Sequence, residues 1–270
     1  MDVSLPAYEV SAFNTAAASD NKIHDDAVAQ RFGFRGGLVP GVEVYAYMTH
    51  LPVARWGRHW LEDGAAECRF LKPVYDGALA RITASAEGDG LALYVDSGGE
   101  RCAAGHAGIA ADRRPAPAVD TMPTAAPPPF AGRPPASEES LAVGRALGIA
   151  PQTIDAAALA DYLEAVRESA PIYRAEGLVH PGQILRLANQ ALVQNVVLGP
   201  WIHVGSKVRH YRAARLGEAL TLRGRITSNA VSKGHAIAAF DAIVVADGKQ
   251  TIAALTHTAI WRPRQAAQAA

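Results

Sequence analysis

Residues 19–48 of this 270-residue chain read SDNKIHDDAVAQRFGFRGGLVPGVEVYAYM, and this stretch determines the expected fold. It begins with a polar segment, residues 19–26, and later reaches a glycine-rich approach, residues 36–41, that leads into an apolar helix. Pro40 stands at the helix start, where a missing N–H is tolerated, and Gly41 lets another group approach the backbone closely. The start of this helix therefore presents free N–H groups and the positive end of a helix dipole.

The second half of the chain repeats these features in the same order. Residues 177–182, GLVHPG, correspond to residues 37–41, GLVPG, and a second long helix is predicted after them, from Gln183 to about Leu198. Residues 68–77 and 208–217 correspond in the same way, at a nearly constant offset. A repeat of this length indicates a duplicated domain rather than a solenoid.

Each half also contains short apolar runs that are separated by turn residues. In the first half these runs cover residues 65–71, 79–86, 91–95 and 101–109, and glycine-containing turns lie between the last three. Short runs with such turns indicate antiparallel hairpins. An apolar helix that precedes strands is buried by lying on one face of their sheet. Two such sheets can join edge to edge, which removes two exposed edges.

A proline-rich segment separates the two halves. Residues 111–136, ADRRPAPAVDTMPTAAPPPFAGRPPA, contain too much proline for regular ladders and favour an extended linker. We therefore predict a first domain over residues 1–110, a linker over 111–136 and a second domain over 137–270. Within the second domain, Ser137 is expected to cap a helix that runs to about Leu147.

The composition excludes several classes of function. Lysine and arginine balance aspartate and glutamate at 26 each, so neither a nucleic-acid nor a membrane-surface partner is indicated. No apolar run reaches the roughly 20 residues of a bilayer span, and the first residues lack a signal-peptide pattern, so we predict a cytoplasmic protein. Cys68 and Cys102 are expected to be buried thiols. Without a glycine-rich phosphate loop, a dinucleotide fingerprint or histidines at metal-site spacing, no cofactor or metal is predicted.

The order of these motifs resembles the MaoC-like, (R)-specific enoyl-CoA hydratase superfamily of acyl dehydratases, in its double-hotdog form. The resemblance rests on three segments: Asn21-Lys22-Ile23-His24, the helix start at residues 36–41, and residues 70–77, FLKPVYDG. They are similar to that superfamily's Asn-Pro-Leu-His-like loop, its Pro-Gly helix start and its Phe-x-x-Pro-Val-x-x-Gly strand. The resemblance covers most of the chain. It implies an α+β tandem hotdog, with two antiparallel sheets that each wrap a long central helix and a Pro-rich linker between them.

The resemblance implies a lyase of fatty acid metabolism that adds or removes water at the 2,3-bond of an acyl thioester on coenzyme A or acyl carrier protein. His24 would then move the proton, because imidazole both accepts and donates near neutral pH. The superfamily carries an aspartate five residues before this histidine. Ser19 stands at that position here, so Asp20 is the candidate partner. Asn21 would orient these groups by hydrogen bonding, and the Gly41 N–H would bind the thioester oxygen.

Simpler roles and other functions stay open. Asp20 and Asp25 also suit a helix start, and His24 could be a loop histidine that caps the short helix after it. Glu43, in the first turn of the apolar helix, would activate water if the chain were a hotdog thioesterase. Tyr173 stands where the second half would have its histidine, so that half is expected to be non-catalytic. A hotdog that binds acyl thioesters or partner proteins without turnover is the remaining alternative, and a homodimer is a further expectation.

Overall fold

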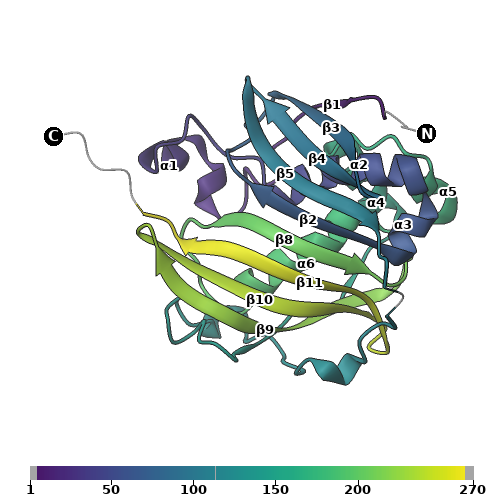
Figure 1. Ribbon diagram of the computed structural model, residues 1–270. Coiled ribbons are helices and arrows are strands. Elements are labelled where there is room, and N and C mark those ends of the chain that lie inside the picture. Colours follow the sequence, from purple (N-terminus) through teal and green to yellow (C-terminus); the bar gives the residue numbers. More distant parts are fainter. Residues whose placement is uncertain (1–4, 113, 265–270) are drawn as a thin grey trace.

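The computed structural model describes residues 5–112 and 114–264, and within them eleven strands form one continuous sheet. Along this sheet the strands follow the order β1-β3-β4-β5-β2-β8-β11-β10-β9-β6, with β7 also paired to β9. The first five belong to the first half of the chain, and the others to the second half. Figure 1 shows the sheet in front and the long helices α2 and α6 behind it.

The strands of the two halves have matching order and antiparallel pairing. The first half contributes β1 (Tyr8–Ser11), β2 (Gly64–Phe70), β3 (Leu79–Glu87), β4 (Gly90–Ser97) and β5 (Glu100–Ile109). The second half contributes β6 (Ala146–Gly148), β7 (Gln152–Thr153), β8 (Ile202–His210), β9 (Ala219–Ser232), β10 (His235–Ala246) and β11 (Gln250–Arg262). The repeat in the sequence is therefore a repeat in the structure.

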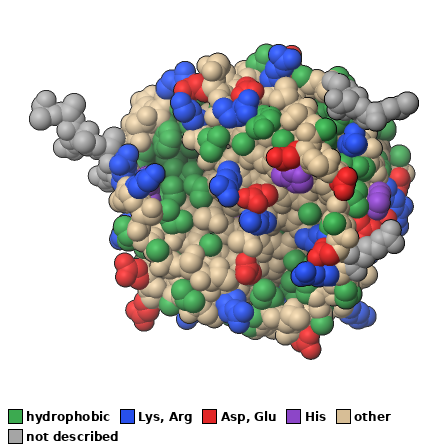
Figure 2. Space-filling view, viewed as in Figure 1, with side chains coloured by type: hydrophobic (Ala, Val, Ile, Leu, Met, Phe, Trp, Pro, Cys, Tyr) green, Lys and Arg blue, Asp and Glu red, His purple; other side chains and the backbone are tan. Residues whose placement is uncertain are grey.

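The two halves meet where β2 pairs with β8. The pairing is antiparallel, and Glu67 lies opposite Lys207 at its centre. The two predicted sheets therefore join edge to edge into one shared sheet. This pairing satisfies backbone groups that two free edge strands would leave exposed. On the outer face of the sheet, Figure 2 shows acidic and basic side chains interspersed. Glu67 and Lys207 of the paired strands form an ion pair at 3.2 Å.

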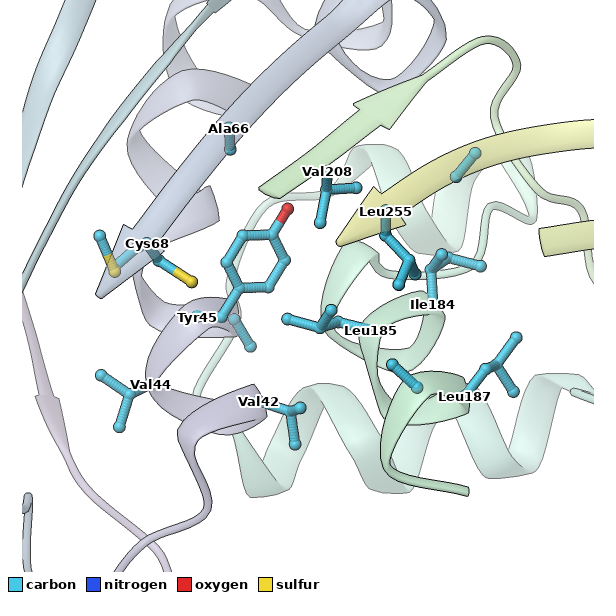
Figure 3. Packing of buried hydrophobic residues seen from close by; sticks show 14 of the residues in the cluster. Val42, Val44, Tyr45, Ala66, Cys68, Ile184, Leu185, Leu187, Val208 and Leu255 are labelled. Atoms are coloured by element: carbon cyan, nitrogen blue, oxygen red, sulfur yellow. The ribbon is translucent and has the colours of Figure 1, made fainter. Parts of the chain in front are cut away.

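The long helices α2 (Gly41–Trp56) and α6 (Pro181–Val193) contact each other and lie on one face of the sheet. Their buried residues form the core together with the inner faces of the strands. In Figure 3, Tyr45 of α2 packs near Cys68 of β2, Val208 of β8 and Leu185 of α6. Packing on both sides explains why α2 is apolar around most of its circumference.

Five shorter elements complete the helical structure that positions the site. They are the 3-10 turn Lys22–His24, α1 (Asp26–Arg31), α3 (Arg58–Asp63), α4 (Ala156–Ala165) and α5 (Ile172–Glu176). Both cysteines are free and buried, as predicted. No helix in the described residues combines the length and apolarity that crossing a membrane requires.

Pro52 lies inside α2, which continues to Trp56. One sequence prediction about a helix was wrong. The helix predicted from Ser137 to Leu147 does not form. There, Ser137 and Ser140 bond to each other in a local turn, Gly144 has φ of 87°, and the segment ends in β6. Local serine hydrogen bonds compete with helix formation in this way.

In the described part of the linker, residues 111–112 and 114–136, there are no strands, and two 3-10 turns lie at Val119–Thr121 and Phe130–Gly132. The limits drawn for the two domains stay predictions.

Candidate active site

The polar segment of residues 19–26 folds into a turn and a helix start that its own side chains stabilise. Asn21 is the N-cap of the 3-10 turn, and Ile23 is buried beneath it. Asp25 caps α1 by accepting the Val28 N–H at 3.0 Å, and Asp26 accepts the Gly37 N–H at 2.6 Å. Asp25 and Asp26 therefore help to hold the loop together.

The His24 ring is oriented by contacts on both of its nitrogens. Nδ1 lies 2.6 Å from the Leu38 carbonyl oxygen, which can only accept, so Nδ1 carries the proton. Nε2 lies 3.2 Å from the Asn21 side-chain nitrogen and is therefore the acceptor. Burial lowers the pKa of His24 from its ordinary value of 6.5, although the Leu38 hydrogen bond acts in the opposite direction. At neutral pH the ring is thus uncharged, with a lone pair on Nε2.

Asn21 also connects this loop to the second half of the chain. Its side-chain oxygen accepts the Trp201 N–H at 3.1 Å, and its side-chain nitrogen donates to the Trp201 carbonyl at 3.0 Å. These two bonds fix the amide next to His24 and tie the loop to the residue that precedes β8. Asn21 therefore positions His24 relative to both halves.

The glycines of the approach bring α2 close to this loop. A Cβ on Gly37 would lie 2.1 Å from the His24 carbonyl oxygen, so only glycine fits there. Val39 donates to the Val74 carbonyl at 2.9 Å, which links the approach to the motif at residues 70–77. The three motifs that the sequence singled out are thus brought together. In the described residues, no hydrogen bond takes up the N–H of Gly41 at the helix start.

These elements surround a cavity of about 250 Å³. Asn21, His24 and Gly41 all line it. The rest of its lining is mostly apolar and comes from both halves: Ile23, Phe34, Leu38, Val39, Pro40, Val44, Phe70, Leu71, Lys72, Pro73, Val74, Asn189, Trp201, Ile202, His203, His235 and Ile260. A concave, largely apolar cavity with a few polar groups is typical of a small-molecule site.

Asp20 is not part of this site, contrary to the prediction. Its side chain is exposed, and it is absent from the lining of the cavity. The 3-10 turn begins at Asn21, so the residue before the cap lies on the solvent side. The lining, as far as the structure describes it, contains no carboxylate at all.

At the level of sequence, no family model matches the chain, and a search of curated proteins finds no match either. Comparison with solved structures does find matches over nearly the whole chain. A protein of Chloroflexus aurantiacus described as a MaoC domain dehydratase is 13% identical, with a TM-score of 0.62 over 95% of this chain and 93% of that one.

Two further solved structures extend this comparison. A Mycobacterium tuberculosis protein described as having a double hotdog fold is 15% identical, with a TM-score of 0.63 over 96% of this chain and 94% of that one. The dehydratase domain of a mycocerosic acid synthase-like PKS is 12% identical, with a TM-score of 0.54 over 96% of this chain and 94% of that one.

The chain has a double hotdog fold. The resemblance found in the sequence is thus confirmed at the level of the fold.

Within this double hotdog, Glu43 has a structural partner. It is buried, and its Oε1 accepts hydrogen bonds from Arg186 Nε at 2.7 Å and from the Thr15 hydroxyl at 3.0 Å. Arg186 lies on α6, so this ion pair joins the two long helices. Glu43 does not line the cavity.

The second hotdog contributes three polar groups that the sequence analysis did not assign to the site. The Asn189 side-chain oxygen, the Trp201 indole nitrogen and His203 Nδ1 are buried and have no hydrogen-bond partner in the described protein. All three residues line the cavity. Buried polar atoms are normally hydrogen-bonded, so these groups suit a polar ligand. The only sequence signal was that Asn189 is polar on an apolar helix.

The corresponding place in the second hotdog is filled with side chains. Tyr173 is fully buried, and its ring packs against His180 with 4.6 Å between centroids. The Tyr162 ring lies 5.4 Å from the same imidazole. Glu168 accepts a hydrogen bond from His50 Nδ1 at 2.8 Å and lies 3.5 Å from His180 Nε2. These four side chains, Tyr162, Glu168, Tyr173 and His180, are therefore part of the core.

Proposed function

We propose that the chain is a hydratase or dehydratase that acts at the 2,3-bond of an enoyl or 3-hydroxyacyl thioester. One observation carries this proposal: a neutral, oriented histidine and an unoccupied helix N–H line the same apolar cavity. The fold shared with solved dehydratases is consistent with it. The substrate brings its own carrier, so the proposal needs no cofactor.

In the dehydration direction, the Asn21 N–H gives up its 3.2 Å hydrogen bond to His24 Nε2, and the freed lone pair accepts the proton from the α-carbon of the 3-hydroxyacyl thioester. The electron pair of that C–H bond forms the 2,3-double bond, the bond between C3 and oxygen breaks, and the hydroxyl takes a proton and leaves as water. Because no carboxylate lines the described cavity, the His24 imidazolium itself returns the proton to the leaving oxygen. Hydration is the reverse of these steps.

The Gly41 N–H stabilises the charge that develops on the thioester oxygen. No group in the part of the chain that the structure describes bonds to this N–H, and it lies at the positive end of the α2 dipole. A donor of this kind contributes about 2.7–4 kcal/mol to transition-state stabilisation. Asn21 holds the His24 ring, and the apolar lining excludes water from the acyl chain.

Thioesterase activity has less support. The acid expected to activate water, Glu43, is held by Arg186 and Thr15 and lies outside the cavity. A hotdog protein that binds acyl thioesters without turnover would differ from a hydratase by showing saturable binding and no product.

The test is to mix purified protein with crotonyl-CoA and follow the loss of the conjugated enoyl absorbance. We expect the absorbance to fall, with 3-hydroxybutyryl-CoA as the product, and no free thiol to appear. Release of thiol would indicate a thioesterase. Saturable binding of several acyl-CoA chain lengths with no turnover of any enoyl form would identify a binding protein and refute the proposal.

A further inference from the structure

We propose that His203, from the second hotdog, binds the 3-hydroxyl of the substrate and the water that replaces it in the enoyl state. The inference rests on the proposed function, since it names the group that recognises the oxygen at C3. His203 lies on β8, close to the seam between the two halves, and only 6% of it is exposed. No sequence motif pointed to it.

The His203 ring presents an unpartnered nitrogen beside the helix start of the first hotdog. Nδ1 has no hydrogen bond in the described protein, and the ring lines the cavity. A Cβ on Gly41 would lie 2.9 Å from His203 Nδ1 and the same distance from the Phe70 ring. Nδ1 thus lies next to the backbone that we expect to bind the thioester oxygen. The C3 hydroxyl is only two carbons from that carbonyl, so a group that binds it must lie near Gly41.

The other nitrogen of the ring is held by a buried chain of hydrogen bonds. His203 Nε2 lies 2.8 Å from the Ser206 hydroxyl, which lies 3.0 Å from His257 Nδ1. The two imidazoles also stack, with 4.0 Å between their centroids. These contacts fix the plane of the His203 ring, which lines the cavity, and leave Nδ1 beside Gly41 without a protein partner.

This chain of hydrogen bonds has two proton arrangements, because a serine hydroxyl both donates and accepts. If Ser206 donates to His203 Nε2, then Nδ1 carries the proton and donates to the oxygen at C3. If Nε2 donates to Ser206, which then donates to His257 Nδ1, then His203 Nδ1 accepts a hydrogen bond from the hydroxyl or water. The same nitrogen can therefore bind the oxygen before and after the reaction, with no net charge.

The electrostatics agree with a neutral role. Burial lowers the pKa of His203 to about 3. Burial and the nearby His203 ring lower that of His257 as well. His203 is therefore a hydrogen-bonding group at neutral pH, whereas the proton transfer stays with His24.

Two properties distinguish His203 from Asn189, the other unpartnered acceptor. Asn189 lies on α6 and is only partly buried, and no contact places its side chain at Gly41. His203 is buried at the helix start and is linked to the His24 loop, because Asn21 bonds to Trp201 two residues before it. A site built to hydrogen-bond a hydroxyl rejects analogues that lack it, since its polar group is then left unpaired.

The experiment compares binding of two unreactive ligands by calorimetry: the amide analogues of 3-hydroxybutyryl-CoA and butyryl-CoA, in which nitrogen replaces the thioester sulfur. We expect wild-type protein to prefer the hydroxylated ligand by about tenfold or more. The matched variants are His203→Asn, whose amide lies near the position of Nδ1, and His203→Gln, whose amide reaches towards Ser206. His203→Asn should keep most of the preference, and His203→Gln should lose it.

A purely structural role for His203, through its bond to Ser206, predicts the opposite ranking of the two variants and would overturn the inference. Loss of the preference in Asn189→Leu, with both His203 variants unaffected, would overturn it too. Should the variants fail to fold, the ¹⁵N resonance of His203 Nδ1 in wild-type protein decides: it should shift with the hydroxylated ligand and not with the butyryl ligand. Hydration of crotonyl-CoA without any preference between the ligands would refute this inference while leaving the proposed function intact. Absence of both turnover and binding would refute the proposed function itself.

Discussion

The starts of α2 and α6 occupy equivalent places in the two hotdogs, yet only the start of α2 faces the cavity. Equivalent backbone bonds hold both approaches, from Val39 to the Val74 carbonyl and from Val179 to the Ala214 carbonyl, each at 2.9 Å. The backbone arrangement is thus shared. The difference between an open and a closed helix start lies in the side chains.

At α6 the closing side chain is the cap itself. His180 Nδ1 accepts the Gly182 N–H at 3.0 Å, and Gln183 completes a capping box. Pro40 stands at the corresponding cap of α2 and has no side-chain hydrogen bond to offer. His180 therefore takes up the N–H of the second helical residue, whereas Pro40 offers no side-chain bond to the equivalent N–H of Val42. At the first helical position, α2 has the N–H of Gly41, and α6 has Pro181, which has none.

We call the first hotdog, in which the start of α2 lines the cavity, the open half, and the second hotdog the closed half. The largest expected effect tests whether the reaction depends on side chains of the open half alone. His24→Ala should lower kcat for enoyl-CoA hydration by about 10²–10⁴-fold, because it removes the proton-transfer group. The matched change in the closed half, Tyr173→Phe, should leave kcat within twofold of wild type. Steady-state kinetics on both variants decide the comparison, and equal losses would show that the closed half also takes part in the reaction.

The second prediction is that alanine at the start of α2 impairs activity, whereas alanine at the start of α6 impairs stability. A Cβ at Gly41 would meet His203 and Phe70 at 2.9 Å, so Gly41→Ala should lower kcat/KM by roughly 100-fold through misplacement of the substrate. A Cβ at Gly182 would lie 2.1 Å from the Tyr162 hydroxyl. Gly182→Ala should therefore lower the free energy of unfolding by about 1–3 kcal/mol through overpacking.

Urea unfolding and steady-state kinetics on both glycine variants measure these effects. A Gly41→Ala variant with normal kcat/KM would contradict the assignment of the open helix start.

The third prediction concerns the buried carboxylate of the closed half. Burial would raise the pKa of Glu168, but the hydrogen bond from His50 and the nearby His180 ring, 3.5 Å away, hold that pKa well below its usual value. A group whose pKa is lower in the folded state stabilises the fold above its unfolded pKa, and this stability is lost as pH falls. Unfolding free energy should therefore decrease below about pH 4.5.

Glu168→Gln should remove part of that pH dependence and lower the unfolding free energy at pH 7 by about 1–3 kcal/mol. Urea titrations at pH 7 and pH 4 measure both effects. Turnover at saturating substrate should stay unchanged, since Glu168 lies in the closed half. An unaltered pH dependence in the variant would show that other groups carry it.

The fourth prediction is the pH dependence of the open half. Because burial lowers the pKa of His24 below 6.5, Nε2 keeps its lone pair at mildly acidic pH. The acidic limb of kcat/KM should thus lie below pH 6.5, as a pH–rate profile of the wild type will show. A limb above pH 6.5 would indicate that a nearby negative charge, absent from the described lining, raises the pKa of this histidine.

The smallest effect is expected at Asp20. Its side chain is exposed and lies outside the cavity, so Asp20→Asn should leave kcat/KM within twofold of wild type. A loss comparable to that of His24→Ala would show that the loop moves its carboxylate into the site during turnover.

The sequence predicted well those features that depend on nearby residues. Asn21, His24 and Gly41 lie within one stretch of chain, and glycines in that stretch force a close approach that the structure shows directly. Asp20 was misplaced because a one-residue change at the start of a turn reverses the direction of a side chain. The segment after Ser137 was misread because its serines serve a turn as well as they would serve a helix cap.

The contribution of the second hotdog was not predictable from a motif. Trp201, His203 and Asn189 reach the cavity because β8 pairs with β2 and because Asn21 bonds across the seam, and both contacts join residues far apart in the chain. The sequence matched residues 177–182 to residues 37–41, two segments that differ in length by one residue, so it did not decide which residue lies opposite Pro40. Backbone hydrogen bonds place His180 there.

The β2–β8 seam lies within a single polypeptide, and this has a consequence for how such a protein diverges. In an assembly of two identical chains, every substitution appears in both copies, so a change that blocks one site blocks its twin. In this chain the two hotdogs are encoded by different parts of one gene, so a substitution can occur in one of them without the other. The second hotdog can thus hold a buried aromatic group around His180 where the first has a cavity, while its own His203 and Asn189 line that cavity. Covalent fusion of the two copies lets their side chains differ while the backbone arrangement stays shared.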